Sequence, residues 1–188
     1  MLVIFDLDET LVHTDAFGST EEYTRDPDFF IFKNYPVYVR RGVRQIFEWL
    51  RDHGIDIGIW SSGTANYIDA VLEHIVPDDI KISIKLSRTD CGRRKVDHGE
   101  IGGYYDRPSK DLSKVEALGY NLNEVLMIED NPDWLDKHPD NVIRIKPYDV
   151  NNEDNELWLI IYYIGMLLET DNVVKANVLQ GRRMKLNG

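Results

Sequence analysis

The stretch VIFDLDETLVHT, from Val3 to Thr14, contains an apolar run that ends abruptly in two acids. Leu2 to Phe5 are all apolar, and Asp6 and Asp8 follow one residue apart. An apolar run that stops at turn-like polar residues is typical of a buried strand ending at a functional edge. Two carboxylates at such an edge repel each other and are costly to bury. A hard divalent cation would offset that cost.

Length and composition indicate one soluble domain with a buried core. The chain has 188 residues, of which 43% are hydrophobic and 29% charged. The net charge of −11 argues against a whole-surface affinity for nucleic acid or an anionic membrane. The one cysteine, Cys91, excludes an internal disulfide and a thiolate zinc cluster. No apolar run reaches the ~20 residues that span a bilayer, and Met1 leads straight into the first strand. We therefore expect an intracellular protein, cytoplasmic or nuclear, with no membrane partner.

The chain alternates predicted strands with predicted helices. Expected strands are 2–6, a second one ending at Ser61, then 80–86, 124–129 and 142–145, and expected helices are 42–53, 64–75, 109–119 and 153–169. Residues 28–39 resemble a hairpin whose turn holds Asn34 and Pro36, residues 91–108 a loop or small hairpin, and 13–28 an irregular acidic stretch. This alternation predicts an α/β fold, a parallel sheet with helices on both faces. Ligands bind such sheets at the carboxyl ends of the strands.

The chemically distinctive residues stand where predicted strands end. They are Asp6, Asp8, Ser61, Glu129 and Asp130, with Lys110 at the start of the helix that leads into the fourth strand. Taken singly, each motif is more often a turn, a helix cap or a solvated side chain. Together, in this order along one α/β pattern, they predict a single site.

That set of residues suits phosphoryl transfer. Oxygen ligands without nearby His or Cys favour Mg²⁺, since the spacing of His13 and His98 resembles no zinc site. One carboxylate can attack phosphorus and form an aspartyl-phosphate, while the other, two residues on, moves the proton. A lysine ammonium and the donors of a Ser-Ser-Gly turn, Ser61 to Gly63, neutralise and bind the phosphoryl oxygens.

These motifs resemble those of the haloacid-dehalogenase superfamily, whose first motif has the form D-x-D-x-T. The closer resemblance is to the branch with the small phosphatases of the RNA polymerase II carboxy-terminal domain, the NLI-interacting-factor-like proteins. FDLDETLVHT, VYVRRGVRQIFEWL, IWSSGTANYIDAVL, LSRTDC, SKDLSKV and VLMIEDNPDWLDKHPDNVIRI carry it. The resemblance implies a haloacid-dehalogenase-like, Rossmannoid domain over 1–170, with insertions at about 15–37 and 88–108, no large cap domain, and a basic tail over 171–188.

The resemblance also implies roles for the catalytic residues. Asp6 would be the nucleophile and a metal ligand, and Asp8 the general acid/base, with its backbone carbonyl on the metal. Ser61 would bind a phosphoryl oxygen, and Lys110 would neutralise charge between Asp6 and the phosphate. Asp130 would complete the shell of Mg²⁺.

Other positions would have supporting or substrate-binding roles. Glu129 would support Lys110 or a water on the metal, and Thr10 closes the first motif. Ser62 and Arg88 are possible phosphate contacts. The aromatic residues Phe17, Phe30, Phe32 and Tyr67 form either an apolar wall for a peptide side chain or ordinary hairpin core.

The sequence departs from the branch at three places. Ser61 stands where the branch usually has Thr, which keeps the donor. Glu129-Asp130 replaces the usual Asp-Asn and adds a carboxylate at the metal-ligand position, which should favour Mg²⁺. Segment 92–108 is longer, and 15–36 shorter, than in the small phosphatases, and both flank the expected mouth. The basic clusters GRRK (92–95) and QGRRMK (180–185) either are solvated or, at 93–95, attract an acidic or multiply phosphorylated partner.

We therefore expect a Mg²⁺-dependent protein serine/threonine phosphatase acting on a phosphorylated protein or peptide. Two alternatives stay open at this point. One is a phosphatase for a small molecule or a nucleic-acid end, which the missing cap and the acidic surface disfavour. The other is a phosphoprotein-binding module without turnover, which the joint presence of Asp6, Asp8 and Lys110 disfavours.

Overall fold

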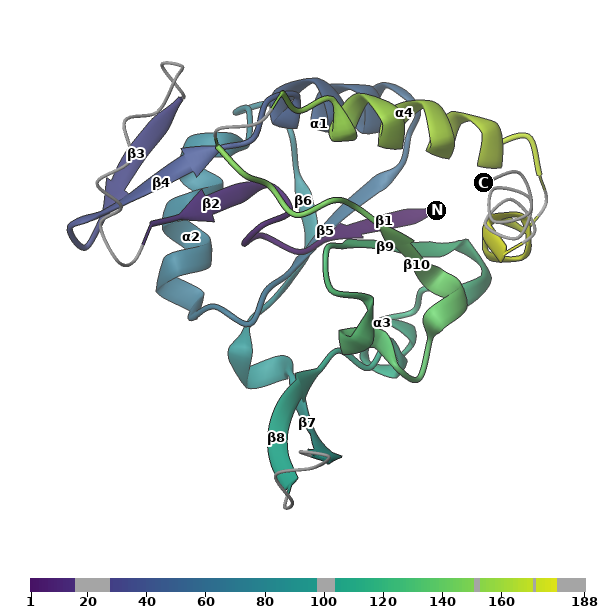
Figure 1. The fold of residues 1–188 in the computed structure, drawn as a ribbon. Coiled ribbons are helices and arrows are strands. Elements are labelled where there is room, and N and C mark those ends of the chain that lie inside the picture. The colour runs from purple at the N-terminus through teal and green to yellow at the C-terminus, as the bar shows by residue number, and fades with distance from the viewer. Residues whose placement is uncertain (16–27, 98–103, 151–152, 171, 179–188) are drawn as a thin grey trace.

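A five-stranded parallel sheet forms the centre of the protein (Figure 1). The computed structural model describes residues 1–15, 28–97, 104–150, 153–170 and 172–178. The strands of this sheet are β1 (Leu2–Phe5), β5 (Asp56–Trp60), β6 (Ile82–Leu86), β9 (Val125–Glu129) and β10 (Val142–Arg144), in the order β10-β9-β1-β5-β6. The predicted α/β fold is confirmed, and each of the five predicted strands is present.

Strand β1 is the middle of this sheet, and its four side chains have no exposed surface. It pairs in parallel with β5 on one side and β9 on the other. A strand covered on both faces needs apolar residues at every position, which explains the uninterrupted run Leu2 to Phe5. The chain leaves β1 toward β5 and β6 and later returns to its other side through β9 and β10. Such a reversal places a ligand site at the carboxyl end of β1.

The two faces of the sheet are covered unequally. On one face, helices α1 (Val43–Asp52), α2 (Ala65–Ile75) and α4 (Glu156–Leu167) pack with Val3 and Phe5 in the larger core cluster. Figure 1 shows α1 and α4 side by side above the sheet. On the other face, Leu2 and Ile4 meet the short helix α3 (Ser113–Glu116) and 3₁₀ turns at Leu122–Glu124 and Pro132–Leu135. Helices therefore cover both faces, as predicted, but the second layer is thin.

A small antiparallel sheet stands beside the carboxyl end of β1. Its order is β2-β4-β3, from β2 (Val12–Thr14), β3 (Phe29–Phe32) and β4 (Tyr35–Val39). Strand β2 replaces the start of the stretch expected to be irregular. The hairpin turn is Lys33–Asn34, both with positive φ, as a type I′ hairpin turn requires. The expected place of Pro36 in this turn was wrong: it lies in β4, beyond the residues that pair with β2.

The segment after β6 forms the second insertion. Strands β7 (Gly92–Asp97) and β8 (Tyr104–Ser109) pair as a hairpin that projects from the domain in Figure 1. The helix expected over 109–119 is shorter than predicted: α3 spans only Ser113–Glu116. Ser109 ends β8 instead of capping a helix, and its hydroxyl donates to Asp136 at 3.4 Å. In the basic cluster, Arg93 is 81% exposed and lies 3.7 Å from Asp106.

Packed structure continues past residue 170, where the sequence placed the start of a tail. Residues 173–178 are helical. Val173 is in the core, and the buried Asn177 side chain donates to the carbonyl oxygens of Asp140 and Val142. The basic run 180–185 lies outside the described residues. Among those described, no helix combines the length and the apolar character needed to cross a bilayer.

Candidate active site

The turn after β1 holds the two acids of the first motif. The Asp6 amide still belongs to the sheet and donates to the Ile128 carbonyl at 3.0 Å. The chain then turns around the Leu7 carbonyl, which accepts from the amides of Thr10, Leu11 and Val12. Glu9 takes a left-handed conformation with φ of 61°, uncommon for a residue with a side chain. This tight turn fixes Asp6 over the sheet edge and places Asp8 beside the small sheet.

Lys110 lies buried between two carboxylates. Its Nζ atom is 2.7 Å from Asp6 Oδ1 and 2.6 Å from Glu129 Oε2, and the residue is 1% exposed. It follows β8 directly, and its amide donates to the Trp134 carbonyl at 2.7 Å. The ammonium also lies 5.1 Å from the centre of the Trp134 ring, within cation–π range. The expected position at the start of a helix was wrong, but the expected meeting with Asp6 and Glu129 is present.

Burial and the charges of their neighbours shift the pKa values of Asp6, Glu129 and Lys110. Burial raises the pKa of Asp6 to about 6, against the opposing pull of Lys110. Burial and then the charge of Asp6 raise the pKa of Glu129 to about 8. Burial alone would lower the pKa of Lys110, but the adjacent carboxylates of Asp6 and Glu129 raise it. Lys110 alone therefore does not stabilise the ionised forms of both Asp6 and Glu129.

The carboxylates fit a Mg²⁺ site. Asp6, Glu129 and Asp130 each bring an oxygen to within 4.8 Å of the others'. Only hard oxygen donors are in this set, as Mg²⁺ prefers, and a divalent cation would offset the burial and the repulsion that raise the two pKa values. Glu129 already holds Lys110, and its other oxygen accepts from the Asn131 amide at 3.2 Å. Asp6 and Asp130 are therefore the carboxylates better placed to bind the ion.

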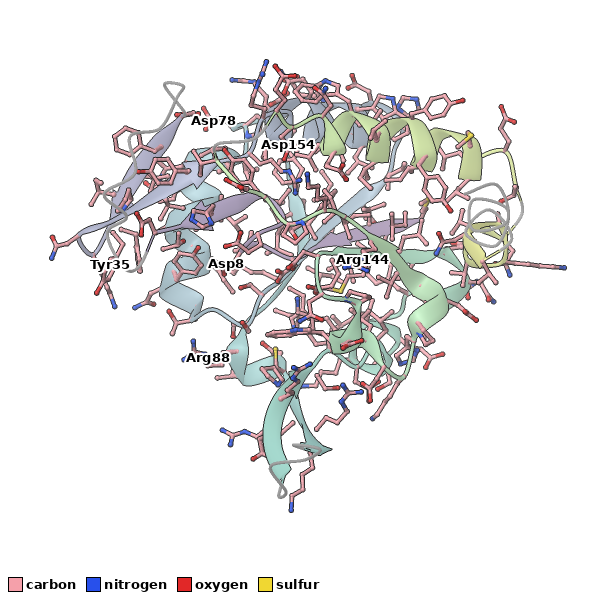
Figure 2. All side chains as sticks on the ribbon, in the orientation of Figure 1. Asp8, Tyr35, Asp78, Arg88, Arg144 and Asp154 are labelled. Carbon is pink, nitrogen blue, oxygen red and sulfur yellow. The ribbon has the colours of Figure 1, made fainter. Side chains whose placement is uncertain are left out.

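Asp8 belongs to a separate hydrogen-bond network on the side of the small sheet (Figure 2). The Tyr67 hydroxyl donates to Asp8 Oδ1 at 2.5 Å and lies 2.7 Å from the Thr14 hydroxyl. Burial raises the pKa of Asp8, although the bond from Tyr67 favours its ionised form. A carboxyl with a raised pKa can hold a proton and release it, as a general acid/base must. The two acids thus have different surroundings although they are two residues apart.

The Ser-Ser-Gly turn connects β5 to α2. Ser61 is buried, and its Oγ accepts from the Gly63 amide at 2.9 Å, which leaves its own O–H to donate elsewhere. A Cβ at position 63 would lie 2.7 Å from Tyr67 Cδ1, so the turn requires glycine. Arg88 binds this turn twice, from its amide to the Gly63 carbonyl at 2.9 Å and from Nε to the Ser62 carbonyl at 2.8 Å.

The remaining predicted residues differ in their surroundings. Thr10 is buried, and within the described residues its hydroxyl has no hydrogen-bond partner. Phe32 contacts the Tyr67 ring at 5.3 Å between centroids, whereas Phe30 is buried and stacks on His74 of α2. Phe17 lies outside the described residues. A role of these side chains in binding substrate stays a prediction.

Sequence reasoning missed two features of the site. Tyr67 was expected as part of an apolar wall, but its hydroxyl, together with Thr14, binds Asp8. Arg40, which carried no predicted role, is buried against the turn that follows Asp8. The spacing of Tyr67 on α2 indicates only a core-facing residue. An arginine at an otherwise buried position is a signal that could have been noticed.

The chain is similar to known proteins over most of its length. A family model described as NLI interacting factor-like phosphatase matches residues 1–174. The chain is 28% identical over 181 residues to the human carboxy-terminal domain RNA polymerase II polypeptide A small phosphatase 1, covering 91% of this chain and 60% of that protein. It is 26% identical over 181 residues to a probable C-terminal domain small phosphatase of Dictyostelium discoideum, covering 91% of this chain and 52% of the other.

A solved structure shares the fold. It is a variant of the fission yeast RNA polymerase II CTD phosphatase Fcp1, bound to beryllium fluoride, with a TM-score of 0.55 and 19% identity, covering 100% of this chain and 56% of that one. At this identity the likeness shows the fold alone. The chain thus spans roughly half of each protein described here, from 52% to 60% of its length.

Proposed function

Because the chain belongs to the family of NLI interacting factor-like phosphatases, we propose that it hydrolyses phosphomonoesters through an aspartyl-phosphate on Asp6. The observation that carries this proposal is the buried contact of Lys110 with Asp6 and Glu129 beside a separately held Asp8. A structural ion pair would need neither a second carboxylate on the lysine nor a separate acid with a raised pKa. A nucleophile, its cation and a proton carrier require all of them.

In the first step, Asp6 attacks phosphorus. Lys110 holds Oδ1, so we assign the attack to Oδ2. As the new O–P bond forms, the bond from phosphorus to the ester oxygen breaks, and Asp8 donates its proton to that oxygen. The Ser61 hydroxyl donates to a phosphoryl oxygen, and Lys110 balances charge that spreads over the phosphoryl group.

In the second step, water hydrolyses the aspartyl-phosphate. Asp8, now ionised, takes a proton from the water as its oxygen attacks phosphorus. The bond between phosphorus and Asp6 breaks, and inorganic phosphate and the free Asp6 carboxylate are released. Tyr67 and Thr14 keep Asp8 in place through both proton transfers, because their hydroxyls bind its Oδ1 atom.

Mg²⁺ would be held by Asp6, Asp130 and the backbone carbonyl of Asp8. When bound, it supplies positive charge to the phosphoryl oxygens. Glu129 is not needed as a ligand in this assignment, because it positions Lys110. The carboxylate that this chain has in addition to the usual Asp-Asn of the branch is Asp130, which replaces the Asn and belongs to the metal site.

We infer that the substrate is a phosphoserine or phosphothreonine on an intracellular protein. Two insertions, the small sheet with β2 to β4 and the β7–β8 hairpin, flank the site without forming a large cap over it among the described residues (Figure 1). An open site suits a phosphoryl group that projects from a polypeptide. A small metabolite would need more enclosure, and a nucleic-acid end would meet a chain with a net charge of −11.

The proposal is tested by hydrolysis of p-nitrophenyl phosphate with Mg²⁺, with EDTA and by the Asp6→Asn variant. We expect turnover that requires both the metal and Asp6. Folded protein without turnover under any divalent metal would refute the enzymatic reading and favour a phosphoprotein-binding module. Phosphopeptides and a panel of phosphorylated metabolites then separate a protein phosphatase from a small-molecule phosphatase, by comparison of kcat/KM.

A further inference from the structure

The turn that carries Asp8 is held from behind by one buried arginine. Arg40 Nη1 donates to the Thr10 carbonyl at 2.9 Å and approaches the Glu9 carbonyl at 3.4 Å. The Arg40 amide donates to the Leu11 carbonyl at 2.9 Å. Three successive peptide groups of the turn thus meet this one residue. None of these contacts involves Asp6 or Asp8 themselves.

The same guanidinium binds a distant part of the chain. Its Nε and Nη2 atoms lie 2.8 and 2.7 Å from Asp154 Oδ2, and Nη2 donates to the Lys146 carbonyl at 2.7 Å. Arg40 is 1% exposed and Asp154 7% exposed. In Figure 2, Asp154 lies on the segment between β10 and α4, which crosses toward β2 in Figure 1. On that segment, the Tyr148 amide donates to the Glu9 carbonyl at 2.7 Å.

A buried ion pair is a poor choice for stability alone. Taking both charges out of water costs most of their attraction, and apolar residues of similar volume often serve the fold as well or better. Here the arginine has a use that an apolar residue cannot supply. Its planar fork donates to carbonyls of a turn in which Glu9 is in a strained conformation, so it holds that conformation in place.

We propose that Arg40, oriented by Asp154, is a positioning residue for the active site. It fixes the carbonyl groups of Glu9, Thr10 and Leu11, and through this turn the orientation of the Asp8 carboxyl relative to Asp6. This inference rests on the proposed function, in which Asp8 protonates the leaving oxygen. When the contacts of Arg40 with the turn are lost, the turn relaxes. Proton transfer by Asp8 then slows by more than the binding of the phosphoryl group weakens.

The test compares Arg40→Lys and Asp154→Asn with the wild-type chain on two substrates. Lysine keeps the positive charge but loses the planar set of donors of arginine. In the wild-type chain Asp154 Oδ1 accepts from the Glu156 amide, and an asparagine side-chain oxygen can still accept this bond. p-Nitrophenolate leaves with little protonation, whereas phenolate from phenyl phosphate needs the general acid. We expect kcat/KM to fall about tenfold more on phenyl phosphate than on p-nitrophenyl phosphate. This is less than the loss expected from removing a general acid, because Asp8 is still present but less well oriented.

Arg44→Lys is the matched control, because Arg44 is an exposed arginine on α1 paired with Glu48. It should leave both substrates unchanged. If Arg40→Lys and Asp154→Asn lower kcat/KM equally on the two substrates, or not at all, the positioning role is overturned. An equal loss is what a reduced folded fraction alone would produce, since it lowers both rates alike. If Arg40→Lys does not fold, Asp154→Asn is judged by the same ratio. Wild-type protein without Asp6-dependent turnover would instead refute the proposed function itself.

Discussion

Replacing Asp6 with asparagine should change how stability depends on pH in metal-free buffer. Burial raises the pKa of Asp6 from its ordinary 3.8 to about 6. Between these values the folded chain binds more protons at this residue than the unfolded chain does. Its contribution to stability is therefore complete below the lower value and is lost as pH rises through the upper one. About two pH units at 1.36 kcal/mol each give a loss of roughly 3 kcal/mol.

An asparagine side chain does not titrate, so the Asp6→Asn variant should escape this loss. Relative to wild type, its free energy of unfolding should increase by about 2 kcal/mol between pH 4 and pH 7, because part of the loss has already occurred at pH 4. Urea unfolding in EDTA, followed by the fluorescence of tryptophans such as the buried Trp60, measures the difference at each pH. A difference that stays constant would show that Asp6 has an ordinary pKa and would refute the electrostatic account of the site.

Three further variants test separate parts of the network. Lys110→Met should lower kcat/KM in steady-state assays by more than about 10²-fold, since it removes a preorganised charge. A loss below tenfold would mean that another residue supplies this charge. Tyr67→Phe removes the donor to Asp8 and so raises the pKa of that acid, which should move the alkaline limb of the kcat/KM profile upward by about one pH unit; an unchanged limb would contradict the contact's importance. Ser61→Ala should reduce kcat/KM about tenfold while Ser61→Thr keeps activity, because the hydroxyl is the donor, and equal activity of the two variants would count against it.

Much of the fold followed from local patterns. The apolar run Leu2 to Phe5 predicted a buried strand, because a strand covered on both faces needs apolar residues at every position. The helices expected over 42–53 and 64–75 are likewise present as α1 and α2, and Thr64 caps α2 by accepting from the Tyr67 amide. The helix after Lys110 was overestimated, because it contributes little more than Val115 to the core and is tied instead by the Lys110 amide to Trp134.

The site was predictable where the motif itself brings residues together, and not where distant parts of the chain meet. Parallel strands end at one edge, so Asp6 and Glu129 were expected to be neighbours. The contacts of Tyr67 with Asp8 and of Arg40 with Asp154 join residues 59 and 114 positions apart. Such pairs depend on how α2 and the segment before α4 pack, and no local periodicity encodes that packing.

The most direct test of the central claim is to trap a phosphoryl group on Asp6. The Asp8→Asn variant lacks the general base for the second step, but p-nitrophenyl phosphate hardly needs the general acid for the first. With Mg²⁺ we predict a burst of one p-nitrophenolate per enzyme, followed by slow turnover. Mass spectrometry should then place one added phosphoryl group on the peptide that contains Asp6. A burst whose phosphoryl group maps to another residue, or turnover with neither burst nor adduct, would contradict Asp6 as the nucleophile.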